Sequence, residues 1–164
     1  MKRMTLILVL GFLWLTVCHA NESANIAIAR SMVDAINDRD LSALDEIIAP
    51  DVVRKSAATA GVTVNSLSEF KEFLESDFMA VPDSVMNIDI IFGNDLFVAM
   101  RVIYSGTQTG QMGPFPPSNM HFELPFIGIL KFEGGKISEI WVEWDNMYVL
   151  GQLGHLSQPE ENPH

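Results

Sequence analysis

Asp145 is the side chain whose type and position point most directly to chemistry, because it ends an apolar strand. The Gly134-Gly135 pair is typical of a two-residue hairpin turn, and a regular hairpin around it would place Asp145 opposite Leu124. Directly opposed residues share a face of the sheet, so the carboxyl group is expected among apolar neighbours. Burial there would raise its pKa above the usual value of about 3.9. The pattern therefore predicts a general acid/base that moves protons on a carbonyl compound near neutral pH.

The same residue also has a structural interpretation. Asp145 directly precedes residues 146–153, which form a predicted short helix, and aspartate is a favoured N-cap. The capping role and the acid/base role are compatible, and the sequence leaves both open.

A ligand cavity beside Asp145 is predicted from the large side chains that share its face in this register. Its expected lining residues are Phe122, Leu124, Phe126 and Trp141. Trp141 would lie opposite Gly128, where its ring could form a cavity wall or pack in the core. Glu143 would share the face of Asp145 and repel its charge, or else reach solvent at an edge.

Three polar residues of the preceding strand complete the candidate site. Arg101 is the only cation in a long apolar run, so we expect it to pair with an acid such as Asp145 or Glu143, or to hold a substrate oxygen. Tyr104 and Gln108 are candidate donors to an enolate oxygen. Core or edge positions are the alternative for both.

Other reaction classes find little support. The one cysteine of the chain is Cys18, within the first 20 residues. The sequence has no G-x-S-x-G elbow for a nucleophilic serine and no G-x-G-x-x-G loop for phosphate binding. Histidines and carboxylates do not occur at metal-ligand spacing with a second supporting pair, so no metal is expected.

Residues 1–20 are typical of an export signal. Lys2 and Arg3 form a basic start, Thr5 to Val17 are almost wholly apolar, and cleavage is predicted after Ala20. An uncleaved anchor and a lipoprotein at Cys18 are the alternatives. The mature protein is therefore expected in the periplasm or outside the cell, with one domain at 21–156 and a disordered tail at 157–164.

The charge excludes some partners. Of the 10 basic residues two lie in the predicted signal, which leaves 8 against 21 acidic residues and a formal charge of −13. Such a protein is not expected to bind nucleic acid or, once the signal is removed, an anionic membrane.

Helical spacing of apolar residues predicts three N-terminal helices. The apolar positions are Ile26, Ala29, Val33 and Ile36; Leu44, Ile47 and Ile48; and Phe70, Phe73, Leu74 and Phe78. Asp40 is the expected N-cap of the second helix, from Leu41 to Ile48. Ser66 with Glu69 forms a capping box for the third, which should end near Ala80.

The pattern then changes to strands. Met86, Ile88, Ile90 and Phe92 alternate, a second run extends from Leu96 to Thr109, and two long strands flank the glycine pair. Helices followed by such strands predict an α+β fold, in which a curved antiparallel sheet is covered by helices on one face.

Both faces of the last hairpin are apolar. The face opposite Asp145 is expected to hold Ile127, Ile129, Ile140, Val142 and Trp144. Helices can cover one face only, so a homodimer is predicted to cover the other.

Several spaced motifs resemble the SnoaL-like polyketide cyclase (ester cyclase) family, within the group that resembles nuclear transport factor 2 and ketosteroid isomerase. These are Tyr104-Ser105-Gly106-Thr107, Gly113 with Pro116-Pro117, Phe132 to Ile137, Glu139, Trp141, Trp144-Asp145 and Gln152-Leu153-Gly154. The resemblance implies a cone-shaped barrel around an apolar cavity, often dimeric. It also implies ring closure by aldol condensation without a metal or organic cofactor, with Asp145 at the position of the family's catalytic aspartate.

The chain departs from the family pattern at several positions, two of which concern histidines. Gln108 stands where many relatives have histidine, and Arg54-Lys55 stand where relatives often carry another. A proton shuttle through those histidines is therefore absent.

Three functions follow from these observations. The first is an exported, cofactor-independent enzyme that cyclises or isomerises a small apolar carbonyl compound. The second is a protein that holds such a molecule in the same cavity without changing it. The third is an assembly domain whose pocket is filled by its own side chains.

Overall fold

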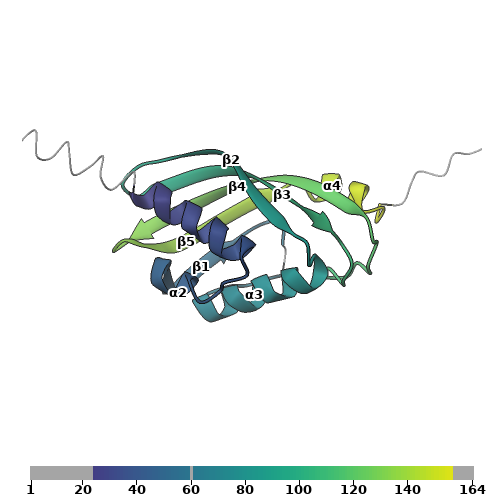
Figure 1. Cartoon of the computed structure of the whole chain (residues 1–164), viewed down its shortest axis with the longest axis horizontal. Coiled ribbons are helices and arrows are strands. Elements are labelled where there is room, and N and C mark those ends of the chain that lie inside the picture. Colours follow the sequence, from purple (N-terminus) through teal and green to yellow (C-terminus); the bar gives the residue numbers. More distant parts are fainter. Residues whose placement is uncertain (1–23, 60, 157–164) are drawn as a thin grey trace, which may run out of the picture.

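A five-stranded curved sheet with helices on one face forms the body of the molecule (Figure 1). The computed structural model describes residues 24–59 and 61–156, so the predicted signal and the predicted tail lie outside the described residues. The sheet does not close into a barrel, and the prediction of an α+β fold with a curved sheet is confirmed. In the described ranges no helix is long and apolar enough to cross a membrane.

The strands pair in an order that differs from their order along the chain. They are β1 (Ile48–Lys55), β2 (Val85–Gly93), β3 (Phe97–Thr107), β4 (His121–Glu133) and β5 (Lys136–Trp144). Across the sheet the order is β1-β5-β4-β3-β2. The four later strands pair antiparallel as predicted, whereas β1 runs parallel to β5.

The helices begin close to the predicted positions. The first spans residues 24–37, and it is followed by α2 (Leu44–Ile47), α3 (Leu67–Ala80) and α4 (Asn146–Gln152). Ser66 Oγ accepts a hydrogen bond from Glu69 N at 3.2 Å, and Glu69 Oε2 accepts one from Asn65 N at 2.6 Å. Both partners of the capping box therefore accept backbone N–H groups, and this fixes the start of α3.

The strand β1 was not predicted from the sequence. The expected helix from Leu41 to Ile48 contains only the single turn α2, after which the chain extends. Pro50 is accommodated because β1 lies at the edge of the sheet, where a missing N–H is tolerated. Its partner β5 is far along the chain, so the pairing leaves no local signal in the sequence.

A β-bulge at Ser138 changes the register of the last hairpin. Glu133 pairs with Lys136 as predicted, but Lys131 pairs with Glu139, so Ser138 has no partner across the ladder. A shift of one residue turns every later side chain to the other face of the sheet.

The predicted faces of β5 are therefore wrong. Trp141 pairs with Ile129 rather than Gly128, and Val142 takes the position opposite Gly128. Trp141, Glu143 and Asp145 do not share the helix-covered face with Leu124. After the bulge, the β5 residues on that face are Ile140, Val142 and Trp144.

Deleting Ser138 is expected to preserve the fold. Ile137 and Glu139 would keep their present partners in a regular hairpin, so the later side chains would face as they do now. Deleting Val142 would instead turn Trp144 away from the helix-covered face. Thermal unfolding followed by circular dichroism should show a small change for the first deletion and a large loss for the second. Equal losses would contradict the observed register.

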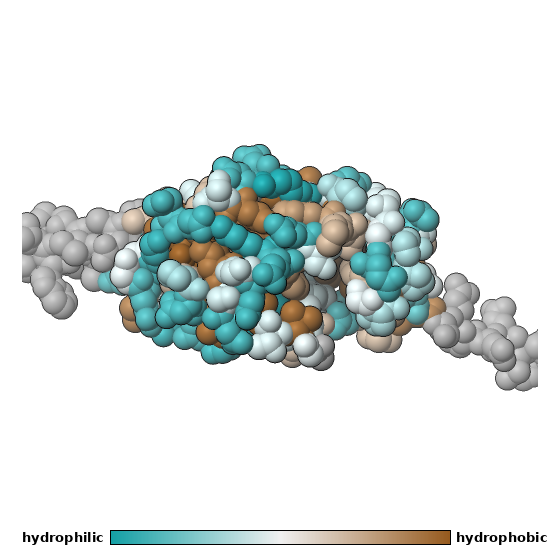
Figure 2. All heavy atoms as spheres, turned by 90° about the horizontal axis from the view of Figure 1, so that it is seen from below, coloured by the Kyte–Doolittle hydropathy of each residue, from teal (hydrophilic) through white to brown (hydrophobic). Residues whose placement is uncertain are grey.

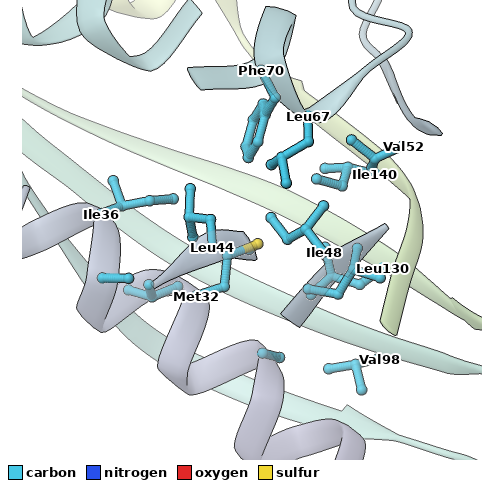
Figure 3. Packing of buried hydrophobic residues seen from close by; sticks show 14 of the residues in the cluster. Met32, Ile36, Leu44, Ile48, Val52, Leu67, Phe70, Val98, Leu130 and Ile140 are labelled. Atoms are coloured by element: carbon cyan, nitrogen blue, oxygen red, sulfur yellow. The ribbon is translucent and has the colours of Figure 1, made fainter. Parts of the chain in front are cut away.

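The helices bury their face of the sheet in two apolar clusters. The larger one joins the first helix, α2, α3 and the sheet, and it includes Met32, Ile36, Leu44, Ile48, Leu67, Phe70 and Leu130 (Figure 3). The smaller one joins α4 to the sheet and includes Val81, Tyr104, Phe122, Leu124, Val149 and Leu153. Members of both clusters line the cavity described below.

The outer face of the sheet carries apolar side chains, but only some of them are the predicted ones. Ile127 and Ile129 lie there and are exposed, together with Ile90 and Phe92 of β2. The other predicted members of this face belong to the inner side because of the bulge. The helical side, seen in Figure 2, is mostly hydrophilic with apolar patches between the polar residues. The homodimer stays a prediction.

Candidate functional site

A cavity of about 860 Å³ lies between the helices and the sheet. The sheet contributes Tyr104, Phe122, Leu124, Phe126, Val142 and Trp144 to its lining. Helix α3 contributes another wall, and the loops at 58–59, 62–64 and 111–115 also line it. Cavities of this size and apolar character are typical of small-molecule sites, and a few polar groups then fix the position of the ligand.

Asp77 and Tyr104 form the central polar contact of this cavity. The Tyr104 hydroxyl donates a hydrogen bond to Asp77 Oδ2 at 2.8 Å, and both residues line the cavity. Burial raises the pKa of the Asp77 carboxyl group, although the Tyr104 hydrogen bond and the charges of Arg39 and Arg54 oppose the shift. Burial also raises the pKa of Tyr104, which therefore stays a hydroxyl donor. A carboxyl group in this state can exchange protons closer to neutral pH.

Helical periodicity carries Asp77 into the cavity. Phe70, Leu74 and Asp77 are spaced at i, i+4 and i+7 along α3, so their side chains lie on one face. This face packs toward the sheet, with Phe70 and Leu74 buried. Asp77 was not predicted from the sequence, although a single acid on an apolar helical stripe was a visible signal.

Arg54 is the second polar group that the sequence analysis did not assign to the site. It lies on β1, its backbone N–H donates to Val64 O at 3.0 Å, and its side chain lines the cavity. The guanidinium carbon lies 4.3 Å from the centre of the Phe73 ring, and Nη1 donates to Thr59 Oγ1 at 3.0 Å. Burial lowers the pKa of Arg54, and the charges of nearby acids oppose that shift.

Asp145 occupies a different place from the one predicted. It is exposed, and it does not belong to the cavity lining. Its Oδ1 accepts hydrogen bonds from Met147 N at 2.9 Å and Tyr148 N at 3.1 Å. Asp145 is therefore the N-cap of α4. The prediction that its carboxyl group is buried, on which its predicted chemistry depended, is wrong.

Trp141 and Glu143 also lie away from the cavity lining, because the bulge turns them outward. The ring of Trp141 packs against Phe97, with 6.5 Å between ring centres. Glu143 is exposed, and its Oε1 accepts a hydrogen bond from Ala57 N at 2.9 Å.

Arg101 forms the predicted kind of salt bridge with an unexpected partner. Its Nη1 contacts Asp89, the bulged residue of β2, instead of Asp145 or Glu143. Both side chains of the pair are partly exposed, and neither residue belongs to the cavity lining. Arg101 is therefore placed to pair within the sheet rather than to hold a substrate oxygen.

Gln108 has a structural position. It is fully buried, and its Nε2 donates to Pro116 O at 3.0 Å. Its Oε1 lies 2.8 Å from His155 Nε2. These contacts connect the 108–120 loop to the segment after α4, and the side chain does not line the cavity.

Four predicted residues do line the cavity: Tyr104, Phe122, Leu124 and Phe126. Their contact with a ligand stays a prediction. Within the described ranges no group of three or more histidine, cysteine or acidic side chains is arranged to hold a metal ion.

The fold and the cavity define the class of protein. The fold is similar to that of a protein from Catenulispora acidiphila described as having a ketosteroid isomerase-like fold. The two chains are 18% identical with a TM-score of 0.66, and the match covers 80% of this chain and 97% of that one. A family model described as SnoaL-like polyketide cyclase matches residues 26–153, and the chain belongs to that family.

Two solved structures from Streptomyces are more similar in sequence. AclR of Streptomyces galilaeus, a proposed hydroxylase, is 26% identical with a TM-score of 0.71 over 83% of this chain and 99% of its own. IdmH of Streptomyces antibioticus, a proposed polyketide cyclase, is 27% identical with a TM-score of 0.71 over 79% of this chain and 98% of its own. No curated protein matches the chain.

Proposed function

We propose that this protein is a cofactor-independent acid/base enzyme of the cyclase or isomerase type that acts on a small apolar carbonyl compound. The observation that carries the proposal is the Asp77–Tyr104 hydrogen bond of 2.8 Å inside a largely apolar cavity. We assign the acid/base role to Asp77 instead of Asp145, because Asp77 lines the cavity and Asp145 does not. Membership of the SnoaL-like family supports a cyclase or isomerase reaction.

The proposed reaction begins with ionised Asp77. A carboxylate oxygen takes a proton from the carbon next to the substrate carbonyl. The electron pair of the broken C–H bond forms the C=C bond of an enolate, and the π pair of the carbonyl moves to its oxygen. In a cyclisation, the enolate carbon then bonds to a second carbonyl carbon, and the new alkoxide takes the proton back from Asp77. In an isomerisation, the proton returns to a different carbon. The apolar walls keep water from competing for the proton.

Deuterium exchange tests this reaction without knowledge of the natural substrate. The probe is 2-tetralone, an apolar ketone with acidic hydrogens next to its carbonyl, in D₂O at neutral pH. We expect the protein to accelerate the exchange above the buffer rate, as read by proton NMR. Exchange at the buffer rate with 2-tetralone bound would count against proton abstraction in this cavity.

Tyr104→Phe is expected to move the pH dependence of this exchange to higher pH. The lost hydrogen bond stabilises the ionised carboxylate, so its removal raises the pKa of Asp77 further. The base form would then appear only at higher pH. Tyr148→Phe, at an exposed position of α4, is the matched control and should leave the profile unchanged. An unshifted profile for Tyr104→Phe would show that the hydroxyl does not act on the group that titrates.

A binding protein is the second candidate, and the raised pKa of Asp77 is the observation that favours it. A carboxyl group that stays protonated can serve as a neutral hydrogen-bonding group for an apolar ligand. Mass spectrometry of the native protein separates the two candidates. A ligand recovered chemically unchanged after long incubation favours binding, whereas conversion by the active protein favours the enzyme.

We also propose export and self-association. The basic and apolar pattern of residues 1–20 supports export with cleavage after Ala20, which the mass of the mature protein would test. The exposed pair Ile127 and Ile129 on the outer face supports a homodimer, which analytical ultracentrifugation would test.

A further inference from the structure

Arg54 places a positive charge inside the apolar cavity. Its residue exposure is only 6%, and it lines the cavity from β1. A buried charge is costly unless it is paired or well hydrogen-bonded. The partners of this guanidinium therefore indicate what the cavity is built to hold.

The protein itself meets only part of this requirement. The Phe73 ring faces the guanidinium at 4.3 Å, and Thr59 Oγ1 accepts one hydrogen bond at 3.0 Å. Both contacts hold the planar group in one orientation. Among the described residues, no carboxylate oxygen lies within 4.0 Å of Arg54 to form an ion pair.

The nearest acids already have other partners. Asp77, in the same cavity, accepts the hydrogen bond of Tyr104, and Glu143 accepts that of Ala57 N. At the cavity lining near the start of α3, Glu69 accepts from Asn65 N. Electrostatic attraction from Asp77 and Glu143 reaches Arg54 without direct contact.

The remaining guanidinium donors are open to the cavity. Among the described residues, Ser56 Oγ is the one fully enclosed side-chain N or O atom that has no hydrogen-bond partner. The nitrogens of Arg54 other than Nη1 are therefore accessible, and the space beside Arg54 is the cavity. A guanidinium with two free donors in one plane matches the two oxygens of a carboxylate.

We propose that the ligand of this cavity is an apolar carboxylic acid whose carboxylate binds Arg54. The inference rests on the proposed function only in placing the ligand in the same cavity, and it adds the substrate class. With its carboxylate at Arg54, the ligand extends along the apolar walls toward Asp77 and Tyr104. A phosphate fits less well, because Arg54 is the one basic residue among the lining residues and three acids share that lining.

A matched pair of ligands tests the inference. The probes are naphthalene-2-carboxylate and its methyl ester, which share the same rings and differ in charge. Wild-type protein at neutral pH should bind the acid about tenfold or more tightly than the ester in calorimetric or NMR titrations. General electrostatics would favour the ester, because the formal charge of the chain is −11, so a preference for the acid requires a local cation.

Arg54 variants assign the preference to its side chain. Arg54→Met should abolish it, and Arg54→Lys should keep part of it, because a point charge remains while the planar fork is lost. If Arg54→Met does not fold, the lysine variant and the wild-type ligand pair decide. Wild-type protein that binds the acid no more tightly than the ester, or a preference that survives Arg54→Met, would overturn the inference. The probe 2-tetralone carries no carboxylate that could bind Arg54. The exchange experiment therefore tests the proposed function independently of this inference.

Discussion

Asp77→Asn is expected to slow deuterium exchange into 2-tetralone by about 10²–10⁴-fold, the usual contribution of a positioned acid or base. Asparagine has nearly the same shape, and its oxygen can still accept the Tyr104 hydroxyl, which donates at 2.8 Å in the wild type. What it loses is the ability to take a proton. The measurement is the exchange rate by NMR, with binding of 2-tetralone measured in parallel.

Asp145→Asn is the matched control for this change. Asparagine is as good an N-cap as aspartate, so the two hydrogen bonds to Met147 N and Tyr148 N can be kept. We expect wild-type exchange and stability. If Asp145→Asn lost the exchange activity and Asp77→Asn kept it, the acid/base role would belong to Asp145 and not to Asp77.

The stability of Asp77→Asn shows whether lost exchange reflects lost structure. A carboxyl group with a raised pKa in the folded state favours folding below the pKa of the unfolded chain, about 3.9, and loses this contribution as the pH rises through the folded pKa. Asparagine has no such dependence. The variant should therefore be at least as stable as the wild type at neutral pH, which urea unfolding at several pH values would measure.

Phe122→Ala is expected to lower the free energy of unfolding by about 3–5 kcal/mol, as is typical for large core aromatics. The ring is 1% exposed, and it packs edge-on against Tyr104 with 5.5 Å between ring centres. Its loss would remove buried apolar area and free the Tyr104 ring that holds Asp77. Denaturant unfolding measures the first effect and the exchange rate of 2-tetralone the second.

Truncation of Met79 provides the comparison for that result. Met79 is 71% exposed on α3, so Met79→Ala should change stability by no more than about 0.5 kcal/mol. A loss for Phe122→Ala as small as that for Met79→Ala would mean that the smaller cluster does not stabilise the fold.

Local patterns in the sequence were sufficient for much of the fold. The capping box at Ser66 and Glu69 located the start of α3, and the glycine pair located the last hairpin. Alternation identified β2, the second run of residues identified β3, and β4 and β5 were predicted as the strands that flank the glycine pair. The strand β1 could not be found in this way, because an edge strand that pairs in parallel with a distant segment has no turn beside it to mark it.

The predicted site was wrong because the predicted register of β5 was off by one residue. A bulge depends on how the strand bends in the folded sheet. The sequence Ile137-Ser138-Glu139 therefore gave no signal that Ser138 would have no partner on β4. The skipped residue reversed the faces of Trp141, Glu143 and Asp145. Asp77 was not predicted, although helical periodicity places it on the apolar face of α3 and could have revealed it.

The pKa of Asp77 in the folded protein tests the central claim most directly. Carboxyl-carbon NMR of protein labelled with ¹³C-aspartate, assigned by comparison with Asp77→Asn, follows this group through a pH titration. Because burial outweighs its favourable contacts, the midpoint should lie clearly above the ordinary value of about 3.9. A midpoint at or below that value would contradict the claim that the cavity holds a carboxyl group ready to exchange protons.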